Sequence, residues 1–99
     1  MRVVQGNIVP IDHSRMVMVI NGRVVDFSKL ELVYQVKHRF LEIYQAPKSK
    51  RFYKVSDGDA NLITELQIIQ LLEQFGSKGT LPKIIEACRK AGIHIEEEA

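Results

Sequence analysis

The 99-residue sequence has one cysteine, no tryptophan and three prolines. One cysteine excludes an internal disulfide framework and is typical of a reducing, cytoplasmic setting. No run of about 18 apolar residues is present to span a membrane. The six glycines are isolated, so none opens a phosphate-binding or dinucleotide-binding loop. His and Cys residues lack metal-ligand spacing, and the sequence therefore predicts neither a metal nor another cofactor.

What is present indicates a folded chain. Hydrophobic residues make up 45% and charged residues 26%, which excludes a disordered composition and predicts a single domain over residues 1–99. The net charge of +2 is unevenly distributed. Residues 1–54 hold ten Lys and Arg against four Asp and Glu, or +6, whereas residues 55–99 hold four against eight, or −4. This asymmetry suggests two faces of different charge.

The N-terminal half has strand signals. Asn21-Gly22 lies between β-branched runs within residues 16–27, a pattern that predicts a hairpin with a type I′ turn. Short apolar runs around residues 3–4 and 8–11 indicate a further strand, with Pro10 favouring an edge position. Residues 51–55 alternate and predict another strand.

Residues 28–45 fit two structures. Ser28 and Glu31 have the spacing of a capping box, and a helical projection gathers the apolar residues on one side. On these grounds we favour a helix that ends before Pro47. The alternative is a strand pair, because Leu30, Leu32, Tyr34 and Val36 also alternate, with residues 40–44 and 51–55 then forming a hairpin.

The C-terminal half predicts two helices. The first covers residues 60–75 after a turn at 56–59, with Ser56 or Asp59 as its cap. The second starts at Thr80, carries Pro82 in its first turn and ends at Gly92. Residues 93–95 suggest a short strand. The expected fold is α+β: a small antiparallel sheet, made of the hairpin strands and strand 51–55, covered on one face by the C-terminal helices.

Catalytic constellations are poorly supported. Asp12, His13 and Ser14 are consecutive, so their side chains diverge and predict a polar turn instead of a triad. Cys88 falls on the apolar stripe of the last helix and is expected to be a buried core residue. We therefore predict a protein without enzymatic activity. A nuclease-like site built from His38, Arg39 and Lys50 is the remaining enzymatic hypothesis.

A basic segment over residues 37–54 carries the main functional signal. Basic side chains release counterions from phosphates, and aromatic rings stack on unpaired bases. The segment predicts nucleic-acid binding, to DNA or RNA, with Tyr53 as the stacking residue. The expected binding residues are Lys37, Arg39, Lys48, Lys50, Arg51, Tyr53 and Lys54.

Three glutamines give a competing hypothesis. Gln67, Gln70 and Gln74 recur at i, i+3 and i+7 on the long helix, so they form one uncharged polar stripe. Such a stripe suits a contact with another polypeptide, either in a homodimer or in a complex with a partner. The protein would then be an interaction module, an accessory subunit or inhibitor, that uses this helix or an open sheet edge.

Overall fold

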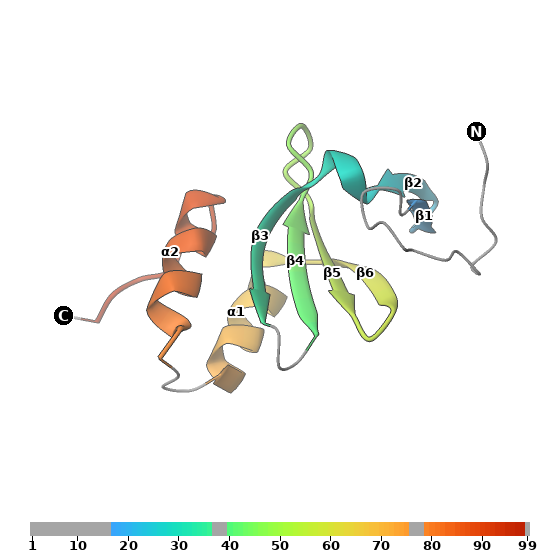
Figure 1. Ribbon diagram of the computed structural model, residues 1–99. Helices are drawn as coiled ribbons and strands as arrows, with labels where there is room; N and C mark the ends of the chain where they lie inside the picture. The colour runs from blue at the N-terminus through green and yellow to red at the C-terminus, as the bar shows by residue number, and fades with distance from the viewer. Residues whose placement is uncertain (1–16, 37–39, 76–78, 99) are drawn as a thin grey trace.

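The computed structural model describes residues 17–36, 40–75 and 79–98 (Figure 1). Those residues form six strands, a short 3₁₀ helix and two α-helices. In chain order these are β1 (Val17–Ile20), β2 (Arg23–Asp26), the 3₁₀ helix (Phe27–Lys29), β3 (Glu31–Val36), β4 (Leu41–Gln45), β5 (Phe52–Ser56), β6 (Asp59–Ile63), α1 (Glu65–Phe75) and α2 (Leu81–Lys90). None of the described helices is long and apolar enough to cross a membrane. The predicted strands at residues 3–4 and 8–11 lie outside the described residues.

The α+β class is confirmed, with the strands divided between two antiparallel sheets. β1 and β2 form a two-stranded hairpin, and β3-β4-β5-β6 form a four-stranded meander in sequence order. The predicted hairpin turn is present, since Asn21 and Gly22 have φ angles of 52° and 79°. Asp57 and Gly58 repeat this geometry between β5 and β6. Positive φ at both central positions is what a type I′ turn requires.

The favoured helix over residues 28–45 is wrong, and the strand alternative is confirmed. β3 pairs antiparallel with β4, and β4 with β5. Along β4, Leu41, Ile43 and Gln45 are buried and the residues between them only partly so. Burial that alternates with a period of two is what a strand produces when the two faces of its sheet have different neighbours. A helix would bury residues with a period of 3.6 instead.

The first C-terminal helix begins later than predicted. Residues 59–63 form β6, and α1 starts at Glu65. The second helix is confirmed over Leu81–Lys90 with Pro82 in its first turn, although Thr80 makes no side-chain capping hydrogen bond. Gly92 follows it with a φ of 95°. The predicted strand at residues 93–95 is not formed.

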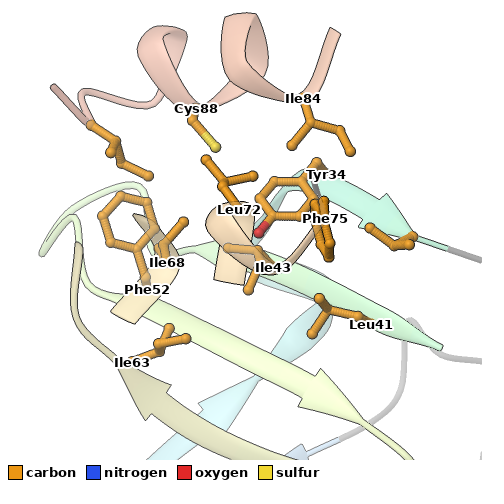
Figure 2. Close-up of a cluster of buried hydrophobic side chains, with 12 residues drawn as sticks. Tyr34, Leu41, Ile43, Phe52, Ile63, Ile68, Leu72, Phe75, Ile84 and Cys88 are labelled. Carbon is orange, nitrogen blue, oxygen red and sulfur yellow. The ribbon is translucent and has the colours of Figure 1, made fainter. Parts of the chain in front are cut away.

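The meander is covered on both faces (Figure 1). On one face, side chains from β3, β4, β5 and β6 pack against α1 and α2, as Figure 2 shows for Ile43, Phe52, Ile68 and Cys88. On the other face, Tyr53 packs with Ile20, Val25 and Phe27, which come from the hairpin and the 3₁₀ helix. The sheet is thus the middle layer of the structure, and side chains on both of its faces are buried.

Candidate functional site

The turn between β4 and β5, residues 46–51, carries most of the predicted cations and is called the basic turn below. The Ala46 amide donates to the Arg51 carbonyl at 2.9 Å, and the Lys50 amide donates to the Ala46 carbonyl at 2.8 Å. The Arg51 amide also donates to Ser49 Oγ at 3.3 Å. Lys50 takes a left-handed φ of 66° to complete the turn. These bonds give the main chain that displays the cations a defined shape.

The cations of the basic turn face solvent. Lys48, Lys50 and Arg51 are exposed, and Gln45 Nε2 donates to the Lys50 carbonyl at 3.4 Å from the buried side of the turn. Within residues 17–36, 40–75 and 79–98, the ion pairs formed are Arg89–Glu97 and His94–Glu96, neither of which involves the basic turn. The three charges are therefore close in sequence, exposed and not neutralised by a described carboxylate.

The ring of Tyr53 is buried and so is not exposed for the stacking that was predicted from the sequence. Its side chain is 3% exposed and lies edge-on to Phe27, with ring centroids 6.3 Å apart at 77°. A base cannot stack on a ring whose faces are already covered. Strand alternation correctly placed Tyr53 opposite Phe52, but the hairpin covers the face on which Tyr53 lies.

The predicted basic segment is described only in part. Lys37 and Arg39, together with His38 of the nuclease-like hypothesis, lie outside the described residues. Among the described residues of this segment, Lys48, Lys50 and Arg51 lie together on the basic turn.

Lys54 belongs to a different surface. It lies in the middle of β5, opposite Asn61 on β6, and is only partly exposed. Both side chains line an open groove of about 320 Å³ beside α1, called the amide groove below. It is lined by Lys54, Asn61, Leu62, Ile63, Gln67, Gln70, Leu71 and Gln74. All three glutamines of the predicted stripe thus line the amide groove.

Gln67 also has a structural task. Its Oε1 accepts the Thr64 amide at 2.9 Å, and Thr64 Oγ1 accepts the Gln67 amide at 3.1 Å. This reciprocal pair is the capping box that starts α1. The spacing of Thr64 and Gln67 is visible in the sequence and could have located the helix start. Asn61 was missed as a groove residue because residues 60–63 were assigned to the helix.

Two features of the described residues bear on metal binding and on thiol chemistry. No group of three or more His, Cys, Asp or Glu side chains within residues 17–36, 40–75 and 79–98 is arranged to hold a metal ion. Cys88 is fully buried between α2 and the sheet (Figure 2), and burial raises the pKa of its thiol to about 11. Such a thiol is a poor nucleophile at neutral pH.

Comparison of the chain with protein families, with curated proteins and with solved structures gave no match.

Proposed function

We propose that the protein binds nucleic acid through the basic turn, with Lys48, Lys50 and Arg51 contacting backbone phosphates. The observation that carries this proposal is the exposure of three cations within four positions of a hydrogen-bonded turn, without a described carboxylate partner. Cations displayed in this way neutralise phosphates and release the counterions that screened them. The binding energy then comes mainly from the sequence-independent part of the contact.

The burial of Tyr53 narrows the proposed binding mode. Because that ring is not available for stacking, the basic turn contacts the charged phosphates and does not distinguish between bases. We therefore expect DNA and RNA of the same length to bind with similar affinity. A contact of this kind has a Kd of about 10⁻⁴–10⁻⁶ M at physiological salt.

The experiment compares two triple variants of equal charge. In the first, Lys48, Lys50 and Arg51 are replaced by Glu. In the second, three exposed cations on other elements, Arg23, Lys83 and Lys90, are replaced by Glu. Fluorescence anisotropy with a labelled 20-nucleotide single strand measures both. The turn variant should lose at least about tenfold in affinity, since close phosphate contacts dominate over distant charge at moderate salt.

The control variant should bind within about threefold of the wild type, because its charges lie outside the contact and are screened. Equal losses in the two variants would show that net charge alone governs binding, and the basic turn would not be the site. Circular dichroism of all three proteins checks that the fold is retained.

The proposal describes a binding protein without catalytic activity and without a cofactor. Its support is the burial of Cys88, which raises the pKa of the thiol to about 11 and makes it a poor nucleophile at neutral pH. RNA that remains intact after incubation with the purified protein is the expected result. The single cysteine supports a cytoplasmic setting as part of the same proposal.

A homodimer also remains a proposal. Val19 and Val24 pair across the hairpin and are 65% and 64% exposed, so the outer face of this two-stranded sheet presents apolar surface. Sedimentation equilibrium of the wild type and of the variant with Val19→Thr and Val24→Thr would test it. The alternative function, as a protein-interaction module, is favoured by the amide groove.

A further inference from the structure

The amide groove runs beside the outer edge of β6. Asn61, Leu62 and Ile63 are consecutive, and all three line it. Neighbouring residues of a strand point to opposite faces of the sheet, so a surface that touches three in a row touches the strand's edge. β5 occupies the inner edge of β6, and the groove therefore includes the outer edge.

Among the described residues, no strand pairs with this edge. In the described meander β6 is a terminal strand, and no hydrogen bond joins its outer main chain to another described segment. Natural edge strands are often protected by lysine, proline or a bulge. The five residues of β6 contain neither lysine nor proline, and Asp59 at the first position is their only charge. The described part of the structure thus leaves main-chain donors and acceptors available along the groove.

The opposite wall of the groove suits a peptide main chain. Glutamine side chains offer both a donor and an acceptor, as peptide groups do. The oxygen of Gln67 is already used by Thr64, so Gln67 presents its NH₂ group as a donor. Gln70 and Gln74 are exposed one and two turns further along α1. The wall can therefore hydrogen-bond the carbonyls and amides of a segment laid beside β6.

The charge of the groove selects among such segments. Lys54 is the only charged side chain that lines it. A segment carrying a carboxylate would be attracted to that ammonium group, and one carrying lysine would be repelled. A nucleic-acid strand fits less well, because one cation serves only one phosphate and no aromatic ring lines the groove for stacking.

We propose that the amide groove binds an extended acidic segment of a partner polypeptide as an additional strand beside β6. Its main chain pairs with the outer edge of β6, as in β-augmentation. Side chains on one face of the segment contact Gln70 and Gln74, and one carboxylate pairs with Lys54. β6 has five residues, so the paired part of the segment measures about 16 Å. This site is separate from the basic turn, and neither proposal depends on the other.

The test uses the full chain, labelled with ¹⁵N, and synthetic octapeptides of alternating β-branched residues that differ only in one central residue: Glu, Gln or Lys. Chemical-shift titration should move the backbone signals of residues 60–63 and the side-chain amides of Gln67, Gln70 and Gln74. The Glu peptide should bind about fivefold more tightly than the Gln peptide, and the Lys peptide more weakly than both.

Two further measurements separate main-chain pairing from charge attraction. N-methylation of alternate amides of the Glu peptide removes the donors on one edge at a time, and one of the two methylated forms should lose binding. Lys54→Glu should reverse the preference between the Glu and Lys peptides. Lys48→Glu, a change of equal charge on the basic turn, should leave that preference unchanged.

Several outcomes would overturn the proposal. The first is that no peptide binds at a concentration of about 1 mM, which is the Kd of a weak contact. The second is that the Glu peptide still binds after either N-methylation. The third is that the chemical-shift changes are confined to residues 46–51. A single-stranded oligonucleotide that shifts the groove signals while the peptides do not would assign the groove to nucleic acid. Failure here leaves the anisotropy measurements on the basic turn unaffected, so the two proposals fail separately.

Discussion

Gln45 Nε2 donates a hydrogen bond to the main-chain carbonyl of Ala91 at 3.1 Å and thereby ties the end of β4 to the end of α2. The same NH₂ group reaches the Lys50 carbonyl in the basic turn. Gln45 is 6% exposed. A buried carboxamide thus positions the basic turn on the α2 side of the fold.

We predict that Gln45→Leu lowers the free energy of unfolding by about 1–3 kcal/mol, because two main-chain carbonyls lose a donor in a buried setting. Leu keeps a similar volume, so the loss reports hydrogen bonds more than packing. Urea denaturation measures it. Gln70→Leu, at an exposed position on α1, is the control and should change stability by less than about 0.5 kcal/mol. Equal effects in the two variants would contradict the role given to Gln45.

The start of α1 allows a matched pair of threonine substitutions. Thr64 is the capping residue, with its side chain bonded to the amide of Gln67, whereas Thr80 before α2 makes no side-chain capping bond. Thr64→Ala should lower stability by about 1 kcal/mol, and Thr80→Ala by a few tenths at most. Thermal unfolding by circular dichroism measures both. A larger loss at Thr80 than at Thr64 would refute the assignment of the cap.

These two helix starts also show what the sequence can decide locally. Ser28-x-x-Glu31 and Thr64-x-x-Gln67 have the same capping-box spacing, yet only the second begins an α-helix. Ser28 instead donates its hydroxyl to the Asp26 carboxylate at 2.6 Å, which lowers the pKa of Asp26. The difference lies downstream, where residues 31–36 pair with β4 and residues 65–75 follow a helical period. A four-residue motif does not contain that information.

Only those features of the candidate site that depend on local sequence pattern could be predicted from the sequence. A loop beside Pro47 predicts that the cations at residues 48, 50 and 51 are exposed, and the structure shows them exposed. The burial of Tyr53 depends on a hairpin about 30 residues earlier that covers the second sheet face. The amide groove depends on β6, and four of its five residues fall within the range 60–75 that the sequence pattern predicts as a helix. Both features are set by tertiary packing and could not be read from local periodicity.

The hydroxyl of Tyr34 is a buried polar group without a hydrogen-bond partner among the described residues. Figure 2 shows Tyr34 within the apolar cluster beneath α2. Tyr34→Phe removes the unsatisfied oxygen and keeps the ring, so we predict a gain of about 1 kcal/mol in unfolding free energy. Urea denaturation checks the sign. A loss of stability would mean that the hydroxyl has a partner in solution.

We predict that ionisation of the Cys88 thiol lowers the free energy of unfolding of the protein in alkaline solution. Burial raises its pKa from 9.0 to about 11, so the unfolded chain releases the thiol proton at lower pH than the folded chain does. Above pH 9 the unfolded state is therefore favoured, and the stability contribution present below that pH declines until about pH 11. The total loss is about 2–3 kcal/mol.

Cys88→Ala tests this pH dependence directly. The variant should be less stable at pH 7 because the core loses a sulfur atom, but its stability should decline less between pH 9 and pH 11. Urea denaturation at several pH values, under reducing conditions, gives both curves. Parallel curves for the two proteins would show that other groups, such as Tyr44 with its pKa raised to about 12, cause the decline.

The salt dependence of nucleic-acid binding tests the central claim most directly. If Lys48, Lys50 and Arg51 each neutralise one phosphate, the logarithm of the association constant should fall with the logarithm of salt concentration with a slope of about −2 for a single strand. Replacing all three by Glu should bring that slope close to zero, while the control variant keeps the wild-type slope. A wild-type slope near zero, or a slope unchanged by the triple replacement, would contradict the account.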